Sequence, residues 1–258
     1  MGRVTIVIMQ RCRLILNGDS PQLARYDGDE NMAIDEALLR SAAEQDSTSL
    51  RFYGWKQPTV SLGYFQNLAD RDSHSSSSHC NVVRRASGGG AIVHDRELTY
   101  CFTKPNQTRF GTEQELYVAF HETLVETLAE RSVVCHLHRA EDGLVDEPFL
   151  CFQRRATGDV IHGKFKIGGS AQRRWKNAVM QHGSVLLAQS SHAPELPGLR
   201  ELAEFSETVT AFTKSWLEKL TSRLNIDVQE SCLTDKELEG ASRLRQEKFA
   251  NNAWTMRR

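Results

Sequence analysis

Apolar and polar residues alternate over many short stretches in the part of the chain before residue 190. This alternation is the pattern of half-buried β-strands, and turn-forming proline and glycine residues separate the stretches. A sheet built from many short strands is therefore expected. The pattern predicts strands near residues 13–16, 50–55, 59–64, 82–83, 91–93, 98–103 and 184–187.

Apolar residues recur at helical spacing in two longer segments, residues 113–131 and 209–220. Another helix is expected to begin with Asn31 as its N-cap, because acidic residues that suit the start of a helix follow it. A further helix opens at Thr234, which begins a capping box. Together these elements predict an α/β (α+β) fold, with a central mixed β-sheet flanked by helices.

Composition and charge narrow the class of protein. The chain has 258 residues, which is enough for one sizeable core or two small ones. Its 32 Lys and Arg residues nearly balance 33 Asp and Glu residues, and this balance argues against a general nucleic-acid-binding protein. A local basic patch would still suit an acidic protein partner. The candidate residues for that patch are Arg84, Arg85, Arg173, Arg174 and Lys176.

No apolar run approaches the roughly 20 residues that span a bilayer, so no membrane association is expected. The short apolar run within residues 1–9 is interpreted as an extra strand or a frayed leader, because a secretory signal needs a longer apolar region. Six cysteines are scattered without a Cys-x-x-Cys pair. Neither a disulfide framework nor a structural zinc site is expected, and a reducing, cytoplasmic compartment is favoured.

A serine-rich segment, residues 68–80, interrupts the strand pattern. It contains His74, His79 and Cys80, which are metal-ligating residue types. The serines between them give no fixed geometry, and no fourth ligand is evident. A solvated loop is therefore expected there, and no metal site.

Cys151 and Lys166 suggest covalent acyl transfer. A nearby ammonium stabilises the thiolate, which is the nucleophilic form of cysteine. Lys166 could also meet the negative charge that develops on an acyl carbonyl oxygen. Two alternatives remain open. A lone cysteine is more often a buried apolar residue, and Lys166 could be a solvated strand lysine like Lys164, with which it would share a strand face.

Two glycine-rich segments occur near this pair. The first, residues 84–95, has three consecutive glycines after Ser87, which permit close approach of the backbone to a ligand. It lacks the Walker A pattern, so it is weak evidence for phosphate binding, and a tight turn between strands is the alternative. His94 and His182 each lie beside a glycine-rich segment. Either is a candidate base, although a structural histidine is the commoner case.

Several motifs in the same order resemble the lipoate ligase, biotin ligase and octanoyltransferase superfamily. They are residues 31–39, 51–55, 61–67, 84–95, 166–172 and 181–187, with further likeness as far as Trp254 and Arg257. Within the superfamily the likeness is closest to the LipM-type octanoyltransferases, because a Cys-Phe pair at Cys151 precedes the Lys-x-x-Gly-Ser-Ala motif at Lys166. The resemblance implies a catalytic domain over residues 14–230. Residues 231–258 would be a C-terminal helical extension packed on the same domain.

The resemblance also implies roles for individual residues. Cys151 and Lys166 would be catalytic. The glycine-rich segments and their neighbours would bind the substrate, and no residue would bind a metal. The implied substrate-binding residues are Arg84, Ser87, Gly88, Gly89, Gly90, His94, Gly168, Gly169, Ser170, Ala171, His182 and Gly183.

The implied reaction moves an octanoyl group from acyl carrier protein to a lysine of a lipoyl domain, through a thioester on Cys151. The acceptor would be the glycine cleavage H protein or the E2 subunit of a 2-oxoacid dehydrogenase. No cofactor would be needed, because the carrier thioester is already activated. One alternative is an ATP-dependent lipoate–protein ligase that uses ATP and Mg²⁺, and another is a protein that only docks lipoyl domains.

Overall fold

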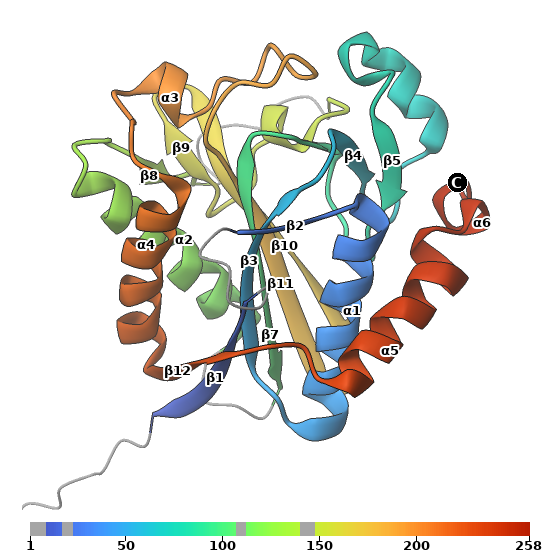
Figure 1. Ribbon diagram of the computed structural model, residues 1–258. Helices are drawn as coiled ribbons and strands as arrows, with labels where there is room; N and C mark the ends of the chain where they lie inside the picture. Colours follow the sequence, from blue (N-terminus) through green and yellow to red (C-terminus); the bar gives the residue numbers. More distant parts are fainter. Residues whose placement is uncertain (1–8, 17–22, 107–111, 140–147) are drawn as a thin grey trace, which may run out of the picture.

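A β-sheet runs through the centre of the molecule with helices on both faces (Figure 1). The computed structural model describes residues 9–16, 23–106, 112–139 and 148–258. The prediction for residues 1–9 therefore lies almost wholly outside the described residues. Within them, nine strands form the main sheet, with strand β2 pairing with β3 and the others in the order β12-β1-β3-β7-β11-β10-β9-β8. Their bounds are β1 Gln10–Ile15, β2 Ala24–Tyr26, β3 Ser49–Trp55, β7 Glu97–Pro105, β8 His136–Leu137, β9 Val160–His162, β10 Phe165–Trp175, β11 Ala178–Leu186 and β12 Ile226–Ser231.

The sheet is mixed, as the sequence predicts. Strands β12, β1, β3 and β2 pair in parallel, whereas the strands from β3 through β7, β11, β10 and β9 to β8 pair antiparallel. A β-bulge interrupts the pairing of β10 with β9 between Lys166 and Gly168. Bulges re-aim the side chains beside them, and this one lies at the predicted catalytic lysine.

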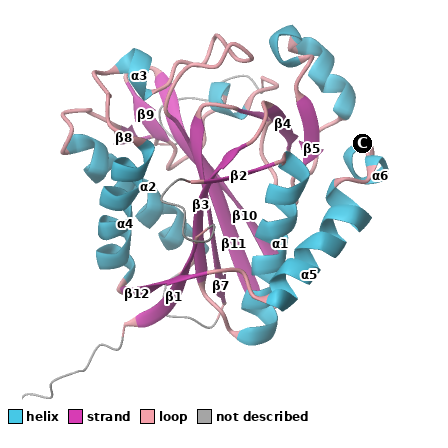
Figure 2. Cartoon of the chain, in the orientation of Figure 1, coloured by secondary structure: helices cyan, strands magenta, loops and turns pink. Residues whose placement is uncertain are grey.

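Two pairs of helices cover the two faces of the sheet (Figure 2). Helices α1 (Gly28–Gln45) and α5 (Asp235–Leu244) pack against each other on one face, and α2 (Glu113–Ala129) and α4 (Val209–Leu224) pack together on the other. Each face buries its own apolar cluster. Fully burying one large apolar side chain contributes roughly 1.5–3 kcal/mol, so these two clusters hold the layers together.

A second, three-stranded sheet carries the first glycine-rich segment. Its order is β5-β4-β6, with bounds β4 Thr59–Leu62, β5 Asn81–Arg84 and β6 Ile92–His94. Residues 85–91 connect β5 to β6, so the three glycines lie at the end of this small sheet. A third apolar cluster, which includes Leu62, Ala91 and Leu150, joins the small sheet to the chain that leads into Cys151.

The last helical elements follow α5 along α1. A π-helical turn, η5 (Arg245–Phe249), leads to the short helix α6 (Asn252–Thr255), which lies beside β5 (Figure 1). One more short helix, α3, spans Leu199–Leu202. No helix in the described part of the chain combines the length and apolar character needed to cross a membrane.

The secondary structure confirms several predictions and corrects two. The helix expected over residues 113–131 is α2, and Thr234 makes the predicted capping box of α5. Helix α1, however, begins at Gly28 rather than at Asn31, whose side chain lies buried inside the fold. The expected solvated loop at residues 68–80 is instead largely two 3-10 turns, η1 (Leu68–Ser73) and η2 (Ser75–Ser77). Arg71 stabilises this arrangement by donating to three carbonyl groups of the same segment.

Candidate active site

Cys151 and Lys166 meet in the folded chain. Cys151 opens the 3-10 turn η4 (Cys151–Gln153), and Lys166 lies on β10. The Nζ atom of Lys166 is 3.7 Å from Sγ of Cys151 and 3.4 Å from its carbonyl oxygen. The thiol is partly exposed, whereas Lys166 is only 6% exposed. A fixed ammonium therefore faces the sulfur, as a charge-stabilised nucleophile requires. Lys164, in contrast, is exposed and not part of this pair.

A backbone connection brings Cys151 to the glycine-rich segment. The amide of Cys151 donates to the carbonyl of Ala91 (2.7 Å), and the amide of Ala91 donates to Phe149 (3.0 Å). These bonds fix the end of the glycine-rich segment beside the sulfur. Gly89 adopts a positive φ of 92°, and a Cβ atom there would lie only 3.1 Å from Nη2 of Arg85. The left-handed backbone and the close guanidinium both favour glycine at position 89, beside the sulfur.

Asp159 is a third member of this group that the sequence analysis missed. Its Oδ2 atom lies 2.8 Å from Nζ of Lys166, and its side chain is 1% exposed. Tyr117 donates to Oδ1 (3.0 Å), and the amide of Ala156 donates to Oδ2 (2.7 Å). Burial alone would lower the pKa of Lys166. The Cys151 thiolate and the Asp159 carboxylate outweigh that effect, so the pKa of Lys166 is raised and the amine stays protonated.

Arg85 fixes the path of the glycine-rich segment by hydrogen bonds to its backbone. Its guanidinium donates to the carbonyls of Gly88 (2.8 Å) and Gly90 (2.6 Å), and also to that of Ser61 (2.8 Å). Burial lowers the pKa of Arg85 to about 10, and the Cys151 thiolate opposes that shift. Arg85 therefore remains a cation at neutral pH and adds a second positive charge near the sulfur.

Arg84 requires a correction, because it does not reach the pocket. Its side chain is fully buried and turns toward the last helix, where it donates to the carbonyl of Thr255 from Nε (3.0 Å) and from Nη2 (2.8 Å). The adjacent Arg85 lines the pocket instead. The basic patch predicted from the sequence also fails in part. Arg84 and Arg85 are buried, and Arg174 forms an ion pair with Glu113.

An apolar pocket opens beside the sulfur. It encloses about 490 Å³, its open mouth included, and most of its lining is apolar. Met32, Trp55 and Phe152 contribute large apolar surfaces that the sequence analysis did not anticipate. Of the predicted site residues, Ser87, Gly90, Lys166 and Gly168 lie around the pocket without lining it. Those that do line it are Gly88, Gly89, His94, Cys151, Gly169, Ser170, Ala171, His182 and Gly183.

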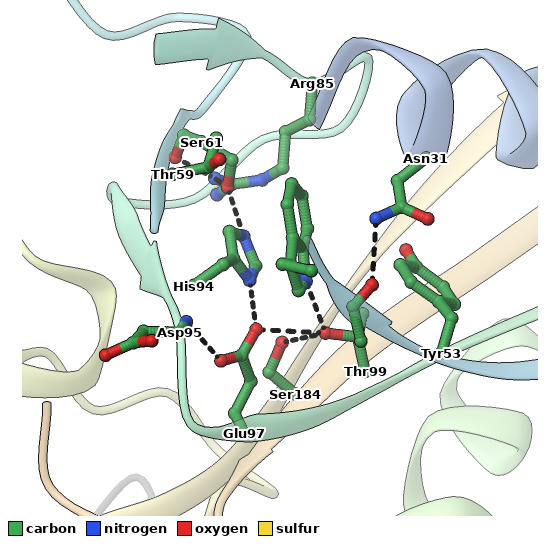
Figure 3. Close-up of polar contacts among 12 residues, drawn as sticks. Asn31, Tyr53, Thr59, Ser61, Arg85, His94, Asp95, Glu97, Thr99 and Ser184 are labelled. Atoms are coloured by element: carbon green, nitrogen blue, oxygen red, sulfur yellow. Dashed lines mark hydrogen bonds and ion pairs between the residues drawn. The ribbon is translucent and has the colours of Figure 1, made fainter. Parts of the chain in front are cut away.

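His94 lines the pocket, and both nitrogens of its ring have hydrogen-bond partners. Figure 3 shows its ring between Ser61 and Glu97. Its Nε2 atom lies 2.8 Å from the hydroxyl of Ser61, and its Nδ1 atom lies 2.7 Å from Oε1 of Glu97. The ring stacks on Trp55 with 3.7 Å between centroids. Burial lowers the pKa of His94 more than Glu97 raises it, so the imidazole is neutral. His94 therefore serves as a wall of the pocket, and no free nitrogen faces a substrate.

His182 is likewise held between two partners. It lies 3.1 Å from Asp35 and 2.5 Å from the hydroxyl of Ser87. Burial would raise the pKa of Asp35, but the His182 hydrogen bond and the Arg51 charge lower it overall. The carboxylate stays ionised and fixes the ring. Ser87 thus connects the glycine-rich segment to β11 through His182, and this contact holds the segment in position.

His121 of α2 fixes the wall that carries Ser170. Its Nδ1 atom donates to the carbonyl of Gly158 (2.6 Å), so its Nε2 atom accepts from the hydroxyl of Ser170 (2.6 Å). Tyr100 in turn donates to Ser170 (2.6 Å). Burial lowers the pKa of His121 to about 4, so this neutral tautomer persists at physiological pH. The contact with Gly158 also anchors the turn that presents Asp159.

Comparison with known proteins agrees with the fold and identifies the family. A family model described as the lipoyl protein ligase A/B catalytic domain matches residues 27–226. Octanoyltransferase LipM of Symbiobacterium thermophilum is 30% identical, covering 95% of this chain and 98% of that protein. Octanoyltransferase LipM of Bacillus subtilis is 27% identical, covering 88% of this chain and 94% of that protein.

Solved structures share the same architecture. Protein Ta0514 from T. acidophilum aligns with a TM-score of 0.77 at 22% identity, covering 96% of this chain and all of that one. A structure of a bi-partite lipoate protein ligase and its E2 lipoyl domain from Thermoplasma acidophilum aligns with a TM-score of 0.71 at 20% identity, covering 96% of each chain. These likenesses show the fold. The family model and the full-length relatives show more: the chain belongs to the lipoyl protein ligase A/B catalytic domain family.

Proposed function

We propose that this acyltransferase moves an octanoyl group from acyl carrier protein to a lysine of a lipoyl domain, through a thioester on Cys151. Relatives named octanoyltransferase match it over nearly their whole length and support the acyl group. The observation that carries the proposal is the distance of 3.7 Å between Nζ of Lys166 and Sγ of Cys151, beside an apolar pocket.

In the first step, the Cys151 thiolate attacks the carbonyl carbon of the carrier thioester. A new carbon–sulfur bond forms to Sγ, and the bond to the carrier sulfur breaks. The carrier leaves as a thiolate that takes a proton from solvent. Lys166 is near enough to Sγ for its ammonium to stabilise negative charge that develops on the carbonyl oxygen.

In the second step, the amine of the acceptor lysine attacks the acyl group on Cys151. An amide bond forms, the bond to Sγ breaks, and the amine releases a proton to solvent. Cys151 returns to its thiolate form facing Lys166. Because both donors in this sequence are thioesters, we propose that the reaction needs no cofactor.

The apolar pocket suits a saturated chain. Burying a methylene group contributes about 0.8 kcal/mol, so the roughly six methylenes of an octanoyl chain contribute about 5 kcal/mol. This is enough to select a medium chain over a short one. The six cysteines are all free thiols, and on that basis we also propose a cytoplasmic location.

A lipoyl domain is the proposed acceptor. A structural neighbour with this fold was described together with its E2 lipoyl domain, which supports the same class of acceptor here. We propose the glycine cleavage H protein or an E2 lipoyl domain. Both would present the lysine that attacks the acyl group on Cys151.

Intact-mass spectrometry tests the proposal. The chain is incubated with octanoyl carrier protein, and we expect a gain of one octanoyl group that peptide mapping locates on Cys151. The variant Cys151→Ala should form no adduct. Replacing the exposed Cys232 with Ala is the matched control and should leave acylation intact. An adduct elsewhere, or full transfer by Cys151→Ala, would refute the thioester mechanism, and a wild-type chain without any adduct would favour a docking protein.

The alternative function is an ATP-dependent lipoate–protein ligase, which the likeness to lipoate ligase structures supports at the level of fold. In that reaction ATP and Mg²⁺ would activate free lipoate, Lys166 would contact the adenylate, and Cys151 would be a bystander. The assay supplies free lipoate and ATP without any carrier thioester. Transfer that requires ATP and survives Cys151→Ala would decide for the ligase.

A further inference from the structure

The buried guanidinium of Arg84 joins two surface segments, neither of which lines the pocket. One is the segment 63–66, whose carbonyls at Gly63 (3.0 Å) and Gln66 (2.6 Å) accept from it. The other is the segment 254–258, whose carbonyl at Thr255 accepts from it (2.8 Å). All of these bonds go to backbone oxygens. Arg84 therefore fixes the backbone path of both segments, and these bonds do not involve the side chains of either segment.

Three arginines project around the two aromatic residues of segment 63–66. Arg257 lies over the ring of Tyr64 at 4.1 Å and donates to its hydroxyl (2.9 Å), and Arg173 lies 5.5 Å from the same ring. Arg258 lies 5.4 Å from the ring of Phe65. The hydrogen bond from Arg257 lowers the pKa of Tyr64; burial opposes this shift, and the charges of the three arginines add to it. In the described part of the chain, no carboxylate forms an ion pair with any of the three.

This cluster borders the catalytic site. Phe65 is 66% exposed, and its ring lies within 3.9 Å of where a Cβ on Gly88 would be. Gly88 lines the pocket, and Arg173 donates to the carbonyl of Ala86 in the same glycine-rich segment (3.1 Å). A second exposed apolar side chain, Met256, lies on the segment 254–258. The surface therefore combines positive charge with exposed apolar side chains beside the glycine-rich segment.

We propose that Arg173, Arg257 and Arg258, together with Phe65, form the docking surface for the acidic carrier protein that delivers the acyl group. The proposal rests on the proposed function, because it assumes a protein-bound thioester donor. A partner with clustered carboxylates would complement the three guanidinium groups, and complementarity of this kind mainly raises the association rate. The guanidinium of Arg257 is held by its stacking and hydrogen bond to Tyr64, so less side-chain freedom is lost on binding.

The test compares two donors in the wild-type chain and in Arg257→Glu/Arg258→Glu. The rate of Cys151 acylation from octanoyl carrier protein should fall by about 10- to 100-fold in the variant and lose most of its salt dependence. The rate from octanoyl-N-acetylcysteamine, a small thioester without a carrier, should stay within about twofold. The neutral variant Arg257→Gln/Arg258→Gln should lie between the two, because it removes the attraction without adding repulsion.

Arg243→Glu is the matched control, since Arg243 is exposed on α5, away from this surface. It should leave both rates unchanged. Equal losses with both donors would mean that the charge reversal distorts the site, and an unchanged rate with the carrier donor would also overturn the proposal. A loss confined to the acceptor step would assign the surface to the lipoyl domain instead.

Direct binding separates failure of this proposal from failure of the proposed function. If the wild-type chain forms no adduct with either donor, the proposed function fails. Calorimetric titration with the unacylated carrier protein at low salt still tests the surface. Weaker binding by Arg257→Glu/Arg258→Glu than by wild type is expected, and equal binding, or no binding by either, overturns the docking proposal.

Discussion

Replacing Asp159 with Asn tests whether the active site is a pair or a group of three. The change keeps the shape of the side chain but removes the charge 2.8 Å from Lys166. Lys166 is 6% exposed, so its ammonium would be left buried with only the thiolate as a counter-charge. Breaking a buried ion pair on one side costs about 3–5 kcal/mol of folding stability. Because Asn can still accept a hydrogen bond, we expect the lower end of that range.

The same change should alter the pH range over which Lys166 carries its positive charge. Asp159 helps raise the pKa of Lys166 above its usual value of 10.5, so in the wild type the positive charge is lost only as the pH rises through that raised pKa. Without the carboxylate, the effect of burial meets less opposition and the pKa of Lys166 falls. Reactions that need the ammonium should then decline at lower pH than in the wild type.

Alkylation of Cys151 by iodoacetamide, followed by peptide mass spectrometry across the pH range, measures this shift. We expect the pH at which alkylation loses the help of the Lys166 ammonium to be lower in Asp159→Asn than in the wild type, because the pKa of Lys166 falls when the carboxylate is removed. The exposed Cys232 serves as an internal control and should react at its wild-type rate. The double variant Lys166→Met/Asp159→Asn should unfold at a higher temperature than Asp159→Asn, because it no longer buries an unpaired ammonium. Wild-type stability with an unchanged pH profile in Asp159→Asn would refute this reasoning.

The remaining predictions concern a close backbone contact and a buried histidine. A Cβ at Gly63 would lie 1.9 Å from the carbonyl oxygen of Gly89, so Gly63→Ala should displace the glycine-rich segment, lower the acylation rate, and cost about 1–3 kcal/mol in denaturant unfolding. Gly240→Ala is the control, since open space surrounds that position on α5, and it should raise stability by up to about 1 kcal/mol. The pKa of His121 falls from 6.5 to about 4 on folding, so between those pH values the unfolded chain binds a proton that the folded chain does not. Stability should therefore fall by about 3 kcal/mol as the pH drops through that window, and His121→Gln should flatten this part of a pH–denaturation curve; an unchanged curve would contradict the assignment.

Local patterns predicted the elements of the fold well, because strand alternation and helix caps depend on residues that are close together in the sequence. The pattern at Asn31 misled for an instructive reason. Asparagine before acidic residues is typical of a helix N-terminus, yet here its amide donates to the carbonyl of Gly54 (3.1 Å) and its oxygen accepts from Arg51 (2.8 Å). That network joins α1 to β3, and only the tertiary fold creates it.

The site was predicted as far as the family resemblance reached. Cys151 and Lys166 meet as expected, but nothing near Asp159 in the sequence marks it as their partner. It reaches Lys166 because β9 and β10 form a hairpin and because α2 brings Tyr117 to the same turn. The adjacent Arg84 and Arg85 could not be distinguished either, since alternation on a strand fixes opposite faces but not which face meets the pocket.

Buried cations hold the backbone and the side chains of the candidate active site in place. Arg85 binds the carbonyls of Gly88 and Gly90 in the glycine-rich segment, and Arg84 binds those of Gln66 and Thr255 outside the pocket lining, so two buried guanidinium groups hold the backbone in place. Lys166 and Arg85 both respond to the Cys151 thiolate, which opposes the loss of their protons. The sulfur thus faces one cation that is balanced by Asp159 and another that is held by carbonyl groups. Such a site presents positive charge to any negative charge that the proposed reaction develops, on the sulfur or on the acyl carbonyl oxygen.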